Sequence, residues 1–369
     1  MLKKFEVENF KNFQNNTVFD LSSKYNYEFN SEVISQANKC ITKGIIYGIN
    51  GAGKSNLGLA IFDIISHLSD RQLNDIKYTP YLNLQSPKSY ATFKYYFSFE
   101  EKEVVYTYKK QSLYELLEES LMINGEEVIY YDYERNKGFT KLKGSENLVL
   151  DNTLSTSTSR IKYLLNTALL TDDETNKAFI NFGKFVNTML LFYSIEGNGY
   201  QGFSNGMETI SDGIIKRGKL KEFESFLRSN DIDYKLAELT INGGKAIGCT
   251  FGDKIVDFFA IASTGTKSLA LFFYWFIQME AASFVYIDEF DAFYHFALSR
   301  NIVGNLKELT DVQIILTTHN TDIMSNDILR PDCYFEIKDK VTPLADLTDK
   351  DLRKAHNLQK MYKAGAFNE

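Results

Sequence analysis

Apolar and polar residues alternate along this chain in two rhythms, which predict where strands and helices lie. Residues 2–20 show the two-residue period of two short strands, and apolar residues 41–49 predict a third strand. A glycine-rich loop follows, and residues 56–68 then repeat apolar side chains at the spacing of a helix. Strand, loop and helix in this order begin a parallel α/β unit.

The pattern changes after about residue 70. Residues 93–99 and 104–108 alternate apolar with polar side chains, as half-buried strands do. Asn124 and Gly125 separate two further apolar runs, and this dipeptide is a strong signal for a tight hairpin turn. Helical spacing then dominates residues 160–240, with loops where glycines gather.

The α/β pattern returns after Gly252. Apolar residues 284–287 and 312–316 predict two buried strands, and we expect a helix after each of them. The chain therefore predicts an α/β fold, with a mixed sheet flanked by helices, that is split by a long α+β insertion. The expected boundaries are two halves of one head at 1–69 and 249–345, an inserted arm or lid at 70–248 that is β-rich over 88–150 and helical over 160–240, and a helical tail at 346–369.

The composition narrows the class of protein. With 369 residues, of which 44% are hydrophobic and 24% charged, the chain can bury a sizeable core, and intrinsic disorder is excluded as its main theme. Its three cysteines are scattered without metal-ligand spacing, which favours reduced thiols over zinc or disulfides. The net charge of −7 comes with no basic block, so charge gives nucleic-acid binding no support but leaves a local basic groove open.

The chain shows no segment that predicts a membrane or a secretion signal. The most apolar window, residues 258–279, is interrupted by polar residues 263–267 and does not reach the ~20 apolar residues of a membrane span. The first eight residues alternate charged and apolar side chains, unlike a signal peptide. We therefore expect a cytoplasmic protein without a membrane partner.

Residues 48–55 fit the phosphate-binding pattern GxxxxGK[ST]. In this pattern glycines let backbone N–H groups face a phosphate, and the next helix presents its positive N-terminus. Lys54 is expected to reach the β- and γ-phosphates, and the Ser55 hydroxyl to bind Mg²⁺. The alternative is a glycine-rich connector with a surface lysine. The expected nucleotide contacts are Gly48, Asn50, Gly51, Ala52, Gly53, Lys54, Ser55 and Asn56.

An acidic pair ends the strand at 284–287 and suits the phosphate loop. Asp288 follows the strand at its carboxyl end, where open α/β sheets bind ligands, and is expected to hold Mg²⁺ through water. Glu289 is expected to polarise the attacking water as a general base. A buried strand often ends in an acid without any such role, but the pairing with a phosphate loop favours the catalytic interpretation.

Two further segments admit both a functional and a plain interpretation. Residues 262–267 place a Ser-x-Gly turn before a helix expected at 268–279, which is either a second anion site or an ordinary cap by Ser263 or Thr266. His319 follows the strand at 312–316, where a histidine can hydrogen-bond a γ-phosphate or have no ligand role.

The order of these motifs resembles ABC-type ATPases of the SMC/RecF branch. Within that branch the chain is most similar to stand-alone RecF-like and OLD-like ATPases of the AAA_15 and AAA_21 type, which occur in bacterial defence systems. The resemblance covers both ends of the chain, roughly half of it. The short segments that carry it are 8–13, 48–55, 262–267, 288–292, 317–321, 329–332 and 361–367.

The resemblance implies ATP and Mg²⁺ as cofactors and slow ATP hydrolysis, with Lys54, Glu289 and His319 as catalytic residues. It also implies a head-to-tail homodimer that sandwiches ATP, in which one subunit completes the other's site through Ser263, Gly265, Thr266 and Lys267.

Further positions are implied for the nucleotide and the metal. Lys11 and Asn12 belong to the opening segment and are expected at the nucleotide, and Gln85 is the candidate for the glutamine that touches the metal, ahead of Gln72. His295 stands where the branch carries the aspartate of its D-loop.

The function that the resemblance favours is an ATP-driven switch controlling a separate effector, a nuclease or a toxin, in anti-phage defence. A RecF-like DNA-repair ATPase is the alternative. A nucleotide-binding scaffold with negligible turnover is a third possibility, which the presence of Glu289 disfavours.

Overall fold

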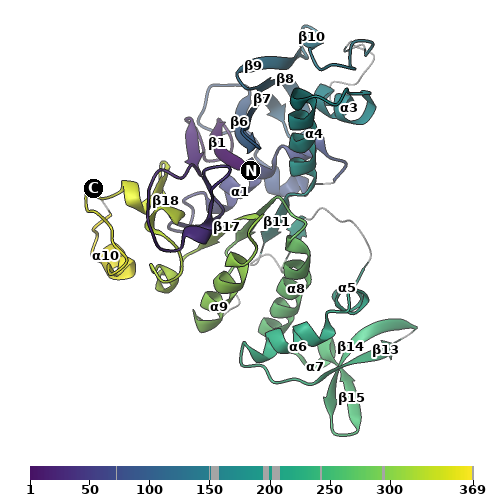
Figure 1. Ribbon diagram of the computed structural model, residues 1–369, viewed down its shortest axis with the longest axis vertical. Helices are drawn as coiled ribbons and strands as arrows, with labels where there is room; N and C mark the ends of the chain where they lie inside the picture. The colour runs from purple at the N-terminus through teal and green to yellow at the C-terminus, as the bar shows by residue number, and fades with distance from the viewer. Residues whose placement is uncertain are drawn as a thin grey trace.

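The computed structural model describes residues 1–71, 73–148, 150, 158–193, 199–201, 208–241, 243–292 and 296–367. An antiparallel sheet forms the upper part of the molecule in Figure 1, a mostly parallel sheet lies below it, and a small lobe forms the lower end. None of the helices in the described residues has the length and apolar surface that a membrane crossing requires.

The antiparallel sheet has seven strands in the order β10-β9-β8-β7-β6-β1-β2. Asn124 and Gly125 join β8 to β9 with φ angles of 50° and 80°, the positive values that a tight hairpin turn requires. The Asn-Gly hairpin and the alternating strands are thus confirmed. The strands are β1 (Leu2–Glu8), β2 (Thr17–Asp20), β6 (Ala91–Phe99), β7 (Lys102–Ser112), β8 (Glu115–Ile123), β9 (Glu126–Asp132) and β10 (Lys137–Thr140).

The second sheet has seven strands in the order β12-β11-β16-β17-β5-β18-β19. Its five inner strands run parallel, and they are buried along their whole length because both faces of the sheet are covered. The carboxyl ends of β5, β16 and β17 therefore meet at one edge. The strands are β5 (Lys43–Tyr47), β11 (Leu190–Tyr193), β12 (Gly199–Gln201), β16 (Phe284–Asp288), β17 (Gln313–Thr318), β18 (Tyr334–Ile337) and β19 (Val341–Pro343).

The stretch expected as one inserted arm, residues 70–248, is divided among three parts of the molecule. Its first strands extend the sheet that β1 and β2 begin, and β11 pairs with β16 in the parallel sheet. The lower lobe stands apart and consists of α5 (Ile210–Lys216), α6 (Leu220–Arg228), β13 (Leu236–Ile241), β14 (Gly244–Phe251), β15 (Lys254–Asp257) and α7 (Phe258–Ile261).

Several helices differ from the sequence expectation. The helix expected over 56–68 is two, α1 (Lys54–Phe62) and α2 (Ile65–Leu68), and α8 (Thr264–Met279) begins before the expected residue 268. After β17 only a 3₁₀ turn follows, so the helix expected there is wrong. The other elements are β3 (Ile34–Ser35), β4 (Cys40–Ile41), α3 (Arg160–Thr167), α4 (Glu174–Asn187), α9 (Phe296–Lys307), α10 (Leu358–Lys363), η1 (Ser31–Val33), η2 (Asp75–Tyr78), η3 (Thr321–Ile323), η4 (Pro331–Cys333) and η5 (Leu344–Asp346).

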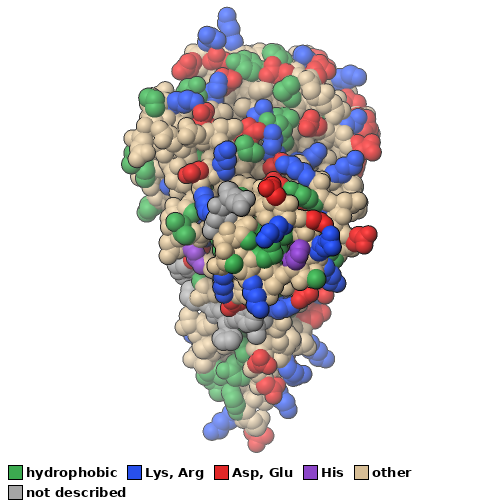
Figure 2. Space-filling view, turned by 90° about the vertical axis from the view of Figure 1, so that its left-hand side faces the viewer, with side chains coloured by type: hydrophobic (Ala, Val, Ile, Leu, Met, Phe, Trp, Pro, Cys, Tyr) green, Lys and Arg blue, Asp and Glu red, His purple; other side chains and the backbone are tan. Residues whose placement is uncertain are grey.

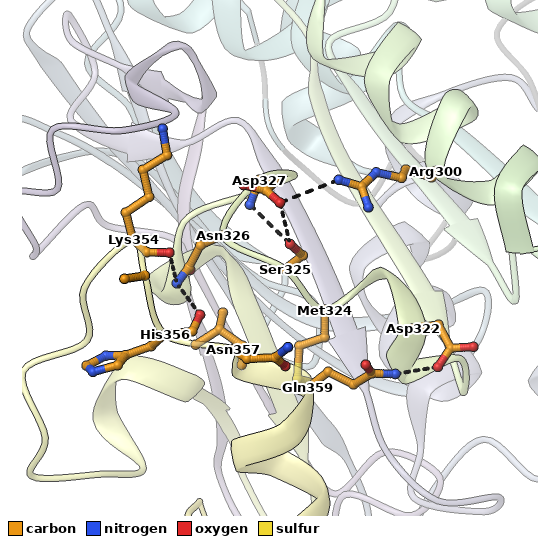
Figure 3. A pocket seen from close by; sticks show the side chains of 12 residues that line it. Arg300, Asp322, Met324, Ser325, Asn326, Asp327, Lys354, His356, Asn357 and Gln359 are labelled. Atoms are coloured by element: carbon orange, nitrogen blue, oxygen red, sulfur yellow. Dashed lines mark hydrogen bonds and ion pairs between the residues drawn. The ribbon is translucent and has the colours of Figure 1, made fainter.

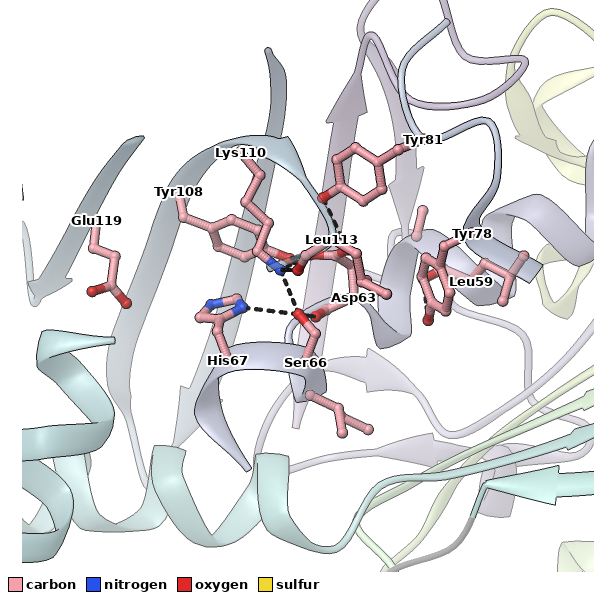
Figure 4. A network of polar contacts seen from close by, with 12 residues as sticks. Leu59, Asp63, Ser66, His67, Tyr78, Tyr81, Tyr108, Lys110, Leu113 and Glu119 are labelled. Carbon is pink, nitrogen blue, oxygen red and sulfur yellow. Dashed lines mark hydrogen bonds and ion pairs between the residues drawn. The ribbon is translucent and has the colours of Figure 1, made fainter. Parts of the chain in front are cut away.

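A buried ion pair lies at the break between α1 and α2. The Lys110 ammonium of β7 donates to the Asp63 carboxylate at 2.9 Å, and both side chains are fully buried (Figure 4). The hydroxyls of Tyr81 and Tyr108 also donate to this carboxylate, each at 2.9 Å. The contacts hold the end of α1 against the antiparallel sheet.

We expect Lys110→Met to lower the free energy of unfolding by about 3 kcal/mol, because the Asp63 carboxylate then stays buried without its cation. Lys109→Met is the matched control, since Lys109 pairs with Glu118 at 2.8 Å at the surface and should cost less than about 1 kcal/mol. Denaturant titration followed by the fluorescence of the single tryptophan, Trp275, measures both. Equal effects of the two substitutions would contradict this account of the ion pair.

Candidate functional site

The phosphate loop connects β5 to α1 and depends on two of its glycines. A Cβ atom at Gly48 would lie 2.7 Å from Ile337 Cγ2, so β18 leaves no room for a side chain there. Gly53 has a φ of 105°, and its Cβ would lie 2.4 Å from Asn12 Nδ2. The Asn12 amide in turn accepts a hydrogen bond from Asn56 Nδ2 at 2.7 Å. Packing therefore fixes the conformation of the loop.

Lys54 is only 5% exposed, and its amine lies along the loop. Nζ donates to the carbonyl of Gly48 at 3.0 Å and lies 2.8 Å from His319 Nε2. Because an ammonium can only donate, this imidazole nitrogen accepts and the ring proton sits on Nδ1. Burial lowers the pKa of Lys54, against the opposing effect of the nearby carboxylates of Glu289 and Asp288.

Glu289 completes a chain of contacts with these two residues. Its Oε1 lies 3.6 Å from His319 Nε2, which is longer than a hydrogen bond. The two side chains are close enough to contact the same bound group. The backbone of Glu289 has a φ of 48°, in the left-handed region. The structure thus brings together the three residues expected as catalytic, from the ends of three neighbouring strands.

The oxygen atoms at this edge fit a magnesium ion. Asp288 is 8% exposed, and the Thr317 hydroxyl donates to its Oδ1 at 2.7 Å, while Oδ2 has no hydrogen bond within the described chain. The Ser55 hydroxyl is exposed at the start of α1. Carboxylate and hydroxyl oxygens are the hard ligands that Mg²⁺ prefers. No group of three or more His, Cys, Asp or Glu in the described residues could hold a metal, so phosphate oxygens would have to supply ligands.

A cavity of about 490 Å³ opens beside the phosphate loop. Ile49 stands at its edge, and 79% of this side chain is exposed. An exposed apolar side chain within a phosphate loop offers an apolar surface for a planar ring. The cavity is lined by Asn12, Phe13, Gln14, Asn15, Thr17, Ile49, Gly51, Ala52, Lys338 and Asp339.

Other expected residues lie outside this constellation. The Lys11 amine donates to the carbonyl of Pro80 at 3.4 Å, and burial lowers its pKa. Gln85 is exposed, and its backbone bonds with Gln14 and Asn83. Gln72 and His295 lie outside the described residues.

Ser263 caps the N-terminus of α8. Its Oγ accepts a hydrogen bond from the backbone N–H of Thr266 at 3.2 Å and lies 2.9 Å from the hydroxyl of the same residue. In Figure 1 this end of α8 lies in the lower lobe, away from the phosphate loop before α1. Within one chain, Ser263 caps α8 and Gly265, Thr266 and Lys267 lie in its first turn, and none of the four is part of the constellation around Lys54.

A second cavity, of about 410 Å³, lies between α9, η3 and residues 354–359 (Figure 3). Among its charged lining residues, Arg300 pairs with Asp327 at 3.7 Å. The buried Asn326 amide donates to the carbonyls of Arg353 and His356 at 3.0 and 3.1 Å. These bonds tie the C-terminal segment to the loop after β17.

Two supporting residues were missed by the sequence interpretation. The Tyr286 hydroxyl donates to the carbonyl of Lys54 at 2.6 Å, and its ring covers Gly58, where a Cβ would lie 2.7 Å from Cε1. This contact joins β16 to α1. Thr317 bonds to both Asp288 and Glu289 and stands in the Thr-Thr-His segment, so its position two residues before His319 was a usable signal.

Residues 45–325 match the family model described as "AAA domain, putative AbiEii toxin, Type IV TA system" (AAA_21). The match spans more than half of the chain, and the chain belongs to this family of P-loop ATPase domains. The family and the fold class expected from the motifs are both confirmed.

Two solved structures illustrate the similarity to SMC heads. An SMC head bound to the C-winged helix domain of ScpA has a TM-score of 0.47 and 18% identity, over 92% of this chain and 96% of that one. The SMC head domain from Thermotoga maritima has a TM-score of 0.44 and 17% identity, over 92% and 97%. No curated protein matches the chain.

We expect Gly53→Ala to destabilise the chain by about 2 kcal/mol more than Gly51→Ala. Both glycines have positive φ angles, 105° and 80°, but a Cβ at Gly51 would meet nothing within 4 Å. Adding Asn12→Ala to Gly53→Ala should recover most of this difference, because it removes the colliding amide. Denaturant titration of these three variants and of the wild type measures this, and a double variant no more stable than Gly53→Ala would refute the collision.

Proposed function

We propose that this chain is an ATP-binding and ATP-hydrolysing switch. The observation that carries the proposal is the convergence of Lys54, Glu289 and His319 at one sheet edge, beside an acidic side chain suited to magnesium. In the proposal, the backbone N–H groups of the loop and the N-terminus of α1 bind the phosphates of ATP. The cavity beside Ile49 takes the adenine ring.

The residues have distinct roles in the proposed reaction. Lys54 leaves His319 and binds phosphate oxygens. The freed histidine then carries a proton on Nε2, where it can donate a hydrogen bond to the γ-phosphate. Glu289 accepts a proton from the attacking water. Ser55 and Asp288 would hold magnesium, and this ion, when bound with ATP, offsets the negative charge of the phosphates.

The proposed site is completed by a second copy of the chain. Ser263, Gly265, Thr266 and Lys267 would bind the γ-phosphate held by the neighbour. The lower lobe, whose last helix α7 ends two residues before Ser263, also exposes large apolar side chains, which is typical of a surface covered in an assembly. These side chains are Ile241, Phe251, Ile255, Val256 and Ile261.

We further propose that the switch controls a separate effector, a nuclease or a toxin, in anti-phage defence. The description of the family, which names a toxin of a type IV toxin–antitoxin system, supports this role. Charge does not favour the alternative of a DNA-repair ATPase, because Figure 2 shows basic and acidic side chains interspersed over the face it presents. Duplex DNA binding with a steep salt dependence would support that alternative.

The first test concerns turnover. We expect slow magnesium-dependent release of phosphate from ATP, with Lys54→Ala losing ATP binding because the phosphates lose their cation. Glu289→Gln should bind ATP with unchanged affinity and hydrolyse it at least about a hundred-fold more slowly, because an amide cannot accept the proton. Phosphate release measures hydrolysis, and binding of a fluorescent ATP analogue measures affinity. If Glu289→Gln hydrolyses ATP at the wild-type rate, Glu289 is not the general base.

The second test concerns assembly. ATP should bring two heads together in Glu289→Gln, and Ser263→Arg added to it should prevent this without loss of ATP binding, because a long side chain holds the subunits apart. Cross-linking of cysteines introduced near residue 263 measures closure of the heads. Ser225→Arg, at an exposed position of α6 in the same lobe, controls for added charge. If neither ATP nor Ser263→Arg changes the cross-linking, the ATP-sandwiched homodimer is excluded.

A further inference from the structure

One buried hydroxyl joins the two acidic residues at the sheet edge. Thr317 lies on β17, fully buried, beside the end of β16. Its Oγ1 donates to Asp288 Oδ1 at 2.7 Å and accepts from the backbone N–H of Glu289 at 2.7 Å. The single hydroxyl proton is committed to the carboxylate, so the orientation of the group is fixed.

The same residue holds the chain where it turns. Glu289 has a φ of 48°, a conformation that is uncommon for residues other than glycine. The hydroxyl of Thr317 takes the N–H of Glu289, and its carbonyl accepts from Phe290 N at 3.1 Å. Two consecutive N–H groups are thus anchored to one residue of the neighbouring strand, and the turn brings the Glu289 carboxylate toward His319.

We propose that Thr317 is the positioning residue of this site. Its one hydroxyl holds the Asp288 carboxylate and the Glu289 backbone in fixed positions relative to each other. This inference rests on the proposed ATPase function. Thr317 does not touch the nucleotide. It leaves Asp288 Oδ2 for the metal and its water, and it fixes the direction of the Glu289 side chain. Metal binding and proton transfer therefore depend on the same hydrogen-bonding group.

The neighbouring Thr318 has a separate task. Its hydroxyl donates to the Asp291 carboxylate at 2.8 Å and accepts from Asn320 N at 2.8 Å, so it organises the loop that carries His319. The two adjacent threonines thus serve opposite sides of the strand. Of these two hydroxyls, only that of Thr317 bonds to Asp288 and Glu289.

The test replaces Thr317 by valine, which keeps the branched shape and removes only the hydroxyl. We expect kcat to fall about ten- to a hundred-fold with little change in the KM for ATP, as is usual when a group behind a metal ligand is lost. Equilibrium binding of mant-ATP, titrated with Mg²⁺, is the second readout. The Mg²⁺ concentration for half-maximal enhancement should rise about ten-fold, while binding in EDTA stays unchanged.

Two variants control for a merely structural effect. Thr317→Ser retains the hydroxyl and should keep both readouts near wild type. Thr42→Val also removes a buried hydroxyl, one without a hydrogen-bond partner in the described chain, and should change neither. Binding in EDTA reports the folded fraction. If Thr317→Val does not fold, Thr317→Ala, which needs less room, takes its place with the same expectation.

The outcomes separate the inference from the function it rests on. If the wild-type protein binds ATP without hydrolysing it, the proposed function fails, whatever Thr317 does. If the wild type hydrolyses ATP and Thr317→Val matches it in kcat and in Mg²⁺ dependence, the positioning role is overturned. It is equally overturned if Thr317→Ser loses as much as Thr317→Val, because the hydroxyl is then not the cause.

Discussion

The parallel pairing of β5, β16 and β17 is the constraint on which the rest of the structure depends. Parallel strands end at the same edge, so the loop after each one is brought to a common place whatever its distance in sequence. Ile287 pairs with Leu316, and Leu316 pairs with Ile45. A shift of this register by one residue would turn Asp288 to the opposite face of the sheet and separate it from Thr317.

Strands between residues 70 and 248 support this register. β11 pairs with β16 on the side away from β17, so the acidic strand is held between two neighbours. On the other side of α1, the buried pair of Asp63 and Lys110 fixes the helix that begins with Lys54 to the antiparallel sheet. The position of the Lys54 amine thus depends on strands that lie far from Lys54 in sequence.

The sequence could predict those features that local residues determine. The Asn-Gly hairpin follows from two residues that tolerate positive φ, and the phosphate loop follows from its glycines and the helix after it. By contrast, β11 is only four residues long, too short for its period to distinguish a strand from a helix. The break at Asp63 depends on a lysine from another strand. The roles of the site residues remain predictions, although the structure brings Lys54, Glu289 and His319 together.

The two interpretations of the turn before α8 do not exclude each other. The Ser263 oxygen accepts from the Thr266 N–H, which is the cap, and either hydroxyl of this pair can donate to the other. If Thr266 donates, the Ser263 proton is free for an anion in front of the helix, where the dipole of α8 favours negative charge. A cap that orders the first turn in the single chain therefore also prepares the donors that a neighbour's phosphate would meet. The conformational entropy of this turn is then lost when α8 folds, so the turn is already ordered when a dimer would form.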